Sequence, residues 1–154
     1  MTTTDTRPDD GPGAMVDRLL AATNAHDLDA LVDCFAADYV NETPAHPSRG
    51  FQGREQVRRN WTQIFAGVGD LRAEVVRRAV DGDLAWVEWD MKGTRRDGVP
   101  HAMRGVTVFR VADGRAAWAS FYLEPVDQQG DSVDDAVHRA VTAPAESAAD
   151  GARS

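Results

Sequence analysis

The sequence predicts an α+β domain in which three N-terminal helices pack on a curved, mainly antiparallel sheet. Apolar residues recur at helical spacing up to Gly67, and they alternate at strand spacing from Leu71 onward. Three turns of the Asp-Gly or Gly-Asp type, at residues 81–83, 97–98 and 113–114, separate the later strands. Helices followed by an antiparallel meander are typical of α+β proteins and not of alternating βαβ units.

A chain of 154 residues is the size of one domain. We expect its folded part to span residues 14–126. Residues 1–13 are polar, with two prolines and two glycines, and are typical of a disordered tail. Residues 127–154 are acidic and alanine-rich, and we expect a short helix there, followed by disorder from Pro144.

Each of the three expected helices carries an apolar stripe at helical spacing. The stripes are Val16, Leu19, Leu20 and Thr23; then Leu28, Leu31, Val32 and Phe35; then Val57, Trp61, Ile64 and Phe65. Asp27 is a suitable N-cap for the second helix, and Gly67 ends the third. Between these two helices, residues 39–43 predict a strand that Pro44 stops, and residues 45–53 predict a loop.

Four strands follow, and alternation divides each into two faces. In the strand from Leu84 the wholly apolar set is the expected inner face, although a shift of one residue would turn Glu88 or Asp90 inward. The expected inward residues are Ala85, Val87, Trp89 and Met91; then His101, Met103, Gly105, Thr107 and Phe109; then Trp118, Ser120, Tyr122 and Glu124.

Charge and composition exclude several classes of partner. The two termini carry most of the net charge of -8, so residues 14–126 are nearly neutral and offer no basic face for nucleic acid. The chain has no run of 18 apolar residues and begins without an apolar signal core, so we expect a cytoplasmic protein that does not bind membranes.

The single cysteine excludes an internal disulfide, and Cys34 is expected to be a half-buried structural thiol. The four histidines do not stand at ligand spacing with carboxylates, so we expect neither a metal site nor a cofactor.

Four local patterns occur in a characteristic order: the opening from Asn24 to Thr43, the helix start at Gly53-Arg-Glu, the strand from Glu88 to Gly93, and the turn Asp113-Gly-Arg. Together they resemble the SnoaL-like branch of the nuclear transport factor 2-like superfamily over residues 14–126. That resemblance implies a cone-shaped α+β barrel with an apolar pocket in its wide mouth. The group includes polyketide cyclases, ketosteroid isomerases, limonene epoxide hydrolases and pocket proteins without known chemistry.

The resemblance does not carry over any complete catalytic set. The base and the oxyanion-hole acid of ketosteroid isomerases would fall on Thr43 and Thr107, which argues against that chemistry. The strand arginine and first aspartate of limonene epoxide hydrolases would fall on Trp89 and Met91. Their second aspartate, like the late acid of SnoaL-like cyclases, would fall on Glu124, and their water-orienting tyrosine and asparagine resemble Tyr39 and Asn41.

We therefore expect Glu124 and His101 to be the catalytic residues. A carboxyl group in an apolar cavity suits acid–base work because burial disfavours its charged form, and histidine is the usual proton carrier. The expected substrate-binding residues are Tyr39, Asn41, Thr43, Trp61, Trp89, Met91, Met103, Thr107 and Tyr122. The expected function is cofactor-free isomerisation, cyclisation or epoxide opening on a hydrophobic organic molecule. The alternative is a non-catalytic binding or interaction module.

An apolar stripe is expected on the outer face of the sheet, formed by Trp86, Val106, Val108 and Phe121. Such a stripe on an open sheet commonly marks a partner surface. We therefore expect a two-fold homodimer that forms through the sheets.

Overall fold

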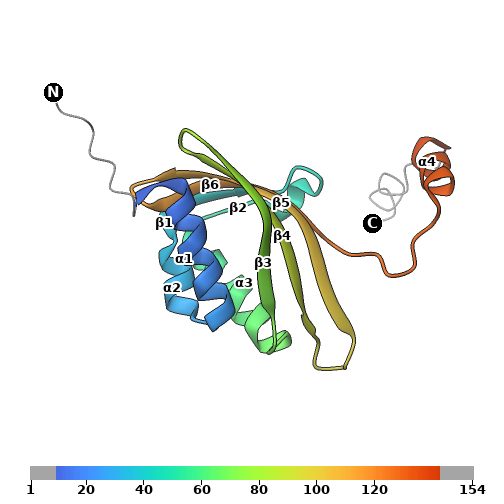
Figure 1. Cartoon of the computed structure of the whole chain (residues 1–154), viewed down its shortest axis with the longest axis horizontal. Coiled ribbons are helices and arrows are strands. Elements are labelled where there is room, and N and C mark those ends of the chain that lie inside the picture. The colour runs from blue at the N-terminus through green and yellow to red at the C-terminus, as the bar shows by residue number, and fades with distance from the viewer. Residues whose placement is uncertain (1–9, 143–154) are drawn as a thin grey trace, which may run out of the picture.

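The computed structural model describes residues 10–142 and confirms the predicted fold class (Figure 1). Three helices pack on one face of a six-stranded sheet. The helices are α1 (Pro12–Ala25), α2 (Leu28–Asp33) and α3 (Arg54–Gly67). The strands are β1 (Phe35–Glu42), β2 (Phe51–Gln52), β3 (Arg72–Asp81), β4 (Leu84–Thr94), β5 (Pro100–Ala112) and β6 (Arg115–Pro125).

The strand order is β2-β1-β6-β5-β4-β3, and every neighbouring pair is antiparallel except β1 and β6. The sheet is strongly curved but open: within residues 10–142, β2 and β3 form its two edges. The expected barrel is therefore a half-open cone. With only two residues, β2 ends the sheet on that side without reaching β3.

Two helix boundaries differ from the prediction. Helix α1 begins at Pro12, inside the stretch expected to be a tail, and α2 ends at Asp33 before its expected last residue, Phe35. Phe35 begins β1 instead, because it pairs with Ala116 of β6 and the Cys34 carbonyl accepts a hydrogen bond from the Ala116 N–H, 2.8 Å. The rest of the expected tail, 1–9, and the expected disorder from 144 onward lie outside the described residues.

The inner face of β4 is the predicted one. Ala85, Val87, Trp89 and Met91 are all buried, so the alternative register with Glu88 or Asp90 inward is not adopted. Helix α1 covers this part of the sheet across β3, β4 and β5, and its Met15 joins the same apolar core. The concave face thus divides into a core under α1 and a second region under α3.

The phase of β6 is opposite to the expected one, because the strand contains a β-bulge. Val111 pairs with Ala116, but the preceding residue Arg110 pairs with Trp118, so Ala117 is an extra residue in β6. An extra residue reverses the alternation beyond it. The outward residues are consequently Trp118, Ser120, Tyr122 and Glu124, and the inward residues are Ala119, Phe121 and Leu123.

Gly105 lets β5 lie unusually close to β6. Its φ is +151°, and a Cβ atom at this position would lie 2.0 Å from the carbonyl oxygen of Tyr122. Only glycine tolerates that approach in the middle of a strand.

The end of α1 is tied to the edge strand β3. The Asn24 Nδ2 donates to the carbonyl of Ala73, 3.0 Å, and the Ala73 N–H donates to the Asn24 Oδ1, 2.7 Å. Next to it, the His26 ring stacks on Phe65 with 4.4 Å between centroids, and its Nε2 makes a 2.8 Å hydrogen bond with the Leu71 carbonyl. These contacts fix α1, α3 and β3 to one another.

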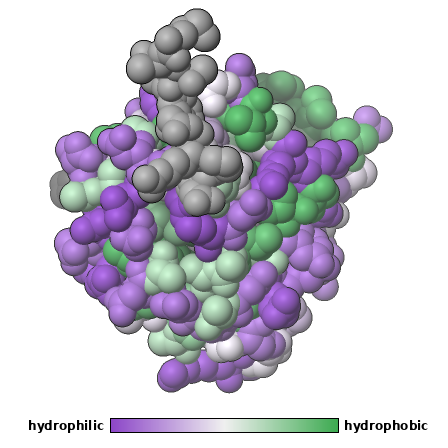
Figure 2. All heavy atoms as spheres, turned by 60° about the vertical axis from the view of Figure 1, so that its left-hand side comes forward, coloured by the Kyte–Doolittle hydropathy of each residue, from purple (hydrophilic) through white to green (hydrophobic). Residues whose placement is uncertain are grey.

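After β6 the chain leaves the sheet, and α4 (Val133–Thr142) lies apart from it with every residue exposed (Figure 1). On the side where α1 and α2 come forward, the surface is mainly hydrophilic (Figure 2). Across residues 10–142, no helix is both long and apolar enough to cross a membrane.

The close approach at Gly105 predicts a stability defect. Gly105→Ala should lower the free energy of unfolding by at least about 2 kcal/mol, because the new methyl group collides with backbone that cannot move aside easily. The measurement is chemical denaturation of both proteins. Gly69→Ala is the control, since no atom lies within 4 Å of a Cβ atom there; equal effects of the two substitutions would contradict the argument.

Cys34 predicts a loss of stability at alkaline pH. Its thiol is buried, and burial raises its pKa from 9.0 to about 11. The unfolded chain releases this proton first, so the stabilisation is complete below pH 9 and is lost as the pH rises towards 11, by about 2 to 3 kcal/mol. Urea denaturation at pH 8, 9.5 and 11 should therefore show a steeper decline for the wild type than for Cys34→Ala. Parallel declines would show that the thiol is not responsible.

Candidate ligand pocket

A cavity of about 460 Å³ lies between α3 and the concave face of the sheet. Its size is typical of small-molecule sites. Its walls are mostly apolar and come from α3, the segment before β3, and all strands except β3. The apolar residues are Phe35, Phe51, Val57, Trp61, Ile64, Leu71, Met91, Met103, Phe121 and Leu123. Such a lining suits a hydrophobic organic molecule.

A chain of hydrogen bonds runs along β1 into this cavity. The Tyr39 hydroxyl donates to the Asn41 Oδ1, 2.8 Å, and the Asn41 Nδ2 donates to the Thr43 Oγ1, 3.3 Å. The three residues stand at alternate positions of the chain, so they share one face of the strand. Burial raises the pKa of the Tyr39 phenol, which keeps this hydroxyl neutral and a hydrogen-bond donor.

Two further polar side chains line the cavity, and the sequence reasoning missed both. Asn60 projects from α3, and its Oδ1 accepts a 2.8 Å hydrogen bond from the Gln56 Nε2. Arg49 comes from the 3-10 turn Pro47–Arg49 between β1 and β2. The helical spacing of Asn60 relative to Val57 would have revealed its side of α3; nothing in the loop sequence marks Arg49.

His101 faces the cavity from the start of β5, opposite Gly93 of β4. Within the described part of the chain, its imidazole has no hydrogen-bond or ion-pair partner. It is the one expected catalytic residue that the structure brings into the pocket. The expected ligand contacts that also line the cavity are Tyr39, Asn41, Thr43, Trp61, Met91 and Met103.

Two residues expected to contact the ligand lie on the concave face of the sheet but are buried away from the cavity. Trp89 and Thr107 are 2% and 0% exposed, and neither lines the cavity. Helix α1 covers this region of the sheet, so both side chains fill the core. The Thr107 Oγ1 has no hydrogen-bond partner among residues 10–142.

Tyr122 and Glu124 are on the opposite face, so their expected inward orientation is wrong. Tyr122 is 48% exposed, and Glu124 pairs with Arg104 in the outward row of β5. The bulge at Ala117 is the reason. The Glu124 Oε1 instead makes a 2.8 Å hydrogen bond with the Nε2 of His46.

The His46–Glu124 contact holds a loop beside the pocket. Residues 43–50 connect β1 to β2, and this loop supplies Thr43 and Arg49 to the cavity lining. His46 attaches it to the end of β6. Glu124 is therefore connected to the pocket through this loop and does not line the cavity itself.

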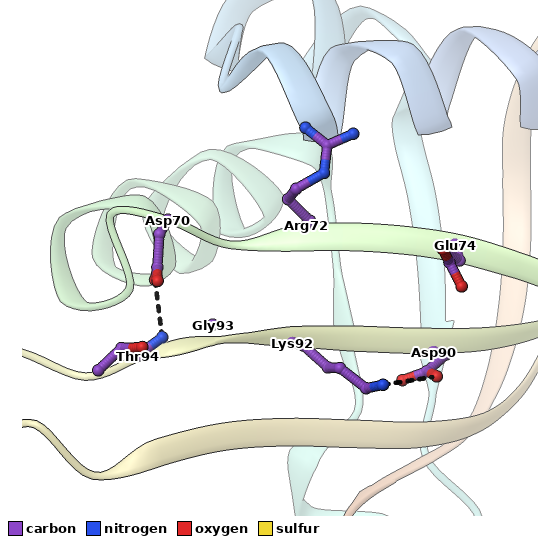
Figure 3. Close-up of a pocket in the computed structure, with 7 residues that line it drawn as sticks. All are labelled: Asp70, Arg72, Glu74, Asp90, Lys92, Gly93 and Thr94. Atoms are coloured by element: carbon purple, nitrogen blue, oxygen red, sulfur yellow. Dashed lines mark hydrogen bonds and ion pairs between the residues drawn. The ribbon is translucent and has the colours of Figure 1, made fainter.

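A second hollow of about 470 Å³ lies over β3 and β4 and is built differently (Figure 3). Its lining is charged: Asp70, Arg72, Glu74, Asp90, Lys92, Gly93 and Thr94. The Asp70 carboxylate accepts a 2.7 Å hydrogen bond from the Thr94 N–H, which lowers the pKa of Asp70, and Lys92 lies 3.5 Å from Asp90. Because this lining is mainly charged and polar, the cavity under α3 is the better candidate for an apolar ligand.

Between residues 10 and 142, no three or more histidine, cysteine or acidic side chains are grouped so that they hold a metal ion.

Comparisons with solved structures agree with this architecture. IdmH of Streptomyces antibioticus, which is proposed to be a polyketide cyclase, is 25% identical with a TM-score of 0.64 over 73% of this chain and 91% of its own. A protein of Catenulispora acidiphila with a ketosteroid isomerase-like fold, solved in complex with trimethylamine, is 22% identical with a TM-score of 0.62 over 73% and 86% of the two chains.

An LEH-like epoxide hydrolase of M. tuberculosis is 19% identical, with a TM-score of 0.61 over 71% of this chain and 80% of its own. At identities under 25%, the last two likenesses show the fold alone. A comparison with curated proteins found no match. The model of the SnoaL-like domain matches residues 16–119, which include most of α1, the loop with His46 and Arg49, and strands β1 to β5, and the chain therefore belongs to the SnoaL-like domain family.

Proposed function

We propose that this protein binds a hydrophobic organic molecule in the cavity under α3 and transfers a proton on it without a cofactor. The observation that carries the proposal is the position of His101, an unpaired imidazole in an otherwise apolar cavity that also holds oriented hydrogen-bond donors. An imidazole can both accept and return a proton near neutral pH, which is what cofactor-free carbon acid chemistry requires.

The donors on β1 suit the oxygen of a carbonyl group. The Asn41 Oδ1 is occupied by Tyr39, so the Asn41 amino group and the Thr43 hydroxyl are the groups left to donate to a ligand. When neutral His101 removes a proton from the carbon beside the carbonyl, the electron pair of the C–H bond moves to form an enolate. Donors placed at the enolate oxygen stabilise the negative charge that develops there.

Two outcomes follow from one enolate. Return of the proton from His101 to another carbon gives isomerisation. Attack of the enolate carbon on a second carbonyl of the same molecule gives cyclisation, and the proton on His101 then passes to the oxygen of the attacked carbonyl. The likeness to IdmH supports the cyclisation outcome. Epoxide opening would need His101 to take a proton from water while the same donors hold the ring oxygen.

The rival proposal is a non-catalytic binding module. It is favoured by the absence of any carboxylate among the described lining residues, since the acids of related enzymes have no counterpart inside this pocket. The two proposals differ in one measurable property, proton exchange at carbon.

We also propose that two copies associate through their sheets. Trp86 and Tyr122 are each 48% exposed on the outer face, and Val106 and Val108 lie beside them in the paired strands. Phe121, expected in this stripe, faces the cavity instead, and Tyr122 takes its place. Large exposed aromatic side chains at the centre of a sheet are characteristic of partner surfaces.

The catalytic proposal predicts hydrogen–deuterium exchange in a bound ketone. The wild type, incubated in D₂O with a panel of bicyclic and aryl ketones, should accelerate exchange of the α-protons, as measured by NMR. His101→Gln should slow that exchange by about a hundredfold, because it removes the proton acceptor and keeps a polar side chain of similar size. His138→Gln, in the exposed helix α4, is the matched control.

Glu124→Gln tests whether Glu124, which the sequence analysis expected to be catalytic, takes part in proton exchange. Exchange that falls with Glu124→Gln and persists with His101→Gln would make Glu124 the catalytic group despite its outward position. Binding of ketones without exchange in any of these proteins would favour the binding module.

The assembly proposal predicts a dimer at micromolar concentration. Light scattering should give twice the chain mass for the wild type and the chain mass for Trp86→Glu, because a carboxylate at the centre of the contact is not compensated there. Val99→Glu places the same charge on another residue that is 46% exposed, in the turn between β4 and β5, and should remain dimeric. A monomeric wild type would refute the proposal.

A further inference from the structure

The polar side chains that line the cavity under α3 can all donate a hydrogen bond. Arg49 and His101 are its only ionisable side chains apart from the neutral phenol of Tyr39, as far as the described residues go, and no acid lines it. The amide oxygens of Asn41 and Asn60 each already accept one hydrogen bond from the protein. Tyr39 donates to the Asn41 Oδ1, and Gln56 donates to the Asn60 Oδ1.

These two contacts orient the amide groups of Asn41 and Asn60. An amide whose oxygen is held by the protein presents its amino group to the remaining space. Asn41 on β1 and Asn60 on α3 therefore offer N–H groups to the cavity from two different walls. A ligand with acceptor atoms satisfies both, whereas a ligand with only donors leaves them unpaired at a cost.

Arg49 adds a full positive charge to the same lining. Within residues 10–142 its side chain forms no ion pair. Arg49 lines the cavity and is exposed, which places its charge at the open end. A guanidinium group binds a carboxylate through two parallel hydrogen bonds, which is its strongest common interaction.

We infer that the pocket selects a hydrophobic carboxylate, with its apolar body against Trp61 and Met103 and its anionic end on Arg49 and Asn60. This inference rests on the proposed use of the cavity as a ligand site, but it does not depend on catalysis by His101. The carboxylate at the mouth leaves the inner part of the molecule to meet the donors on β1. Arg49 is thus a specificity-determining residue that selects ligands by charge, and the apolar walls select them by shape.

A matched pair of probes tests the inference: 2-naphthylacetate, an anion at pH 7.5, and the neutral 2-naphthylacetamide, which has the same skeleton. Isothermal titration calorimetry should show that the wild type binds the carboxylate about tenfold more tightly, a preference worth about 1.4 kcal/mol. The preference should shrink at 0.5 M salt, because the guanidinium group is exposed to solvent.

Three variants locate the preference. Arg49→Gln should remove the preference, because it should weaken binding of the carboxylate about tenfold and leave binding of the amide unchanged. Asn60→Asp, which is nearly isosteric, places a negative charge inside the cavity and should make the amide the tighter ligand. Arg139→Gln removes one positive charge from the exposed helix α4, far along the chain from the pocket, and should keep the wild-type preference.

The outcomes are distinct. Equal binding of the two probes to the wild type, or an unchanged preference in Arg49→Gln, would overturn the inferred selectivity and leave the cavity as a ligand site. Binding of neither probe would overturn the ligand site and the selectivity together. A carboxylate preference in a protein that exchanges no α-protons would support the selectivity and refute the catalytic proposal.

Discussion

The bulge at Ala117 is the constraint on which the pocket depends. One extra residue in β6 turns Phe121 and Leu123 into the cavity and turns Glu124 out of it. The cavity thereby gains apolar wall and loses the one acid that the last strand offers. What remains inside is a cation, an imidazole and amide donors, so the chemistry available differs from that of a pocket built around a carboxylate. The close approach of Gly105 to β6 occurs in the same region of the sheet, because Gly105 pairs with Leu123.

Much of the fold follows from local pattern. The inner face of β4 was predictable because its two faces differ sharply: one is wholly apolar, and the other carries Glu88, Asp90 and Lys92. In β6 both alternating sets contain large apolar side chains, so hydrophobicity alone does not choose between them. The bulge that sets the inward face of β6 occurs in Ala-Ala-Trp, a sequence that contains no glycine to indicate a bulge. Phe35 was misassigned for a related reason, since pairing with β6 outweighs its place in a helical stripe.

The site was predictable where its residues lie on one strand and obscure where it depends on packing. Tyr39, Asn41 and Thr43 share a face of β1, so their grouping is a property of alternation. Trp89 and Thr107 share the correct face too, but the position of α1 decides that they belong to the core. Arg49 enters the cavity only because a loop folds over it, and His46 fixes that loop through Glu124. No spacing rule contains such information, because it arises between elements distant in sequence.

The contact of Asn24 with Ala73 also bears on how these molecules behave at high concentration. An edge strand presents free N–H and C=O groups that can recruit a strand of another molecule. At Ala73 the Asn24 carboxamide already supplies the donor and the acceptor that an incoming peptide group would supply. The end of α1 thus blocks the addition of another strand to β3 at this position. Farther along β3, the irregular pairing between Val75 and Arg77 breaks the flat register that an added strand would need. The open cone can in this way keep an unpaired edge without becoming a template for fibrils.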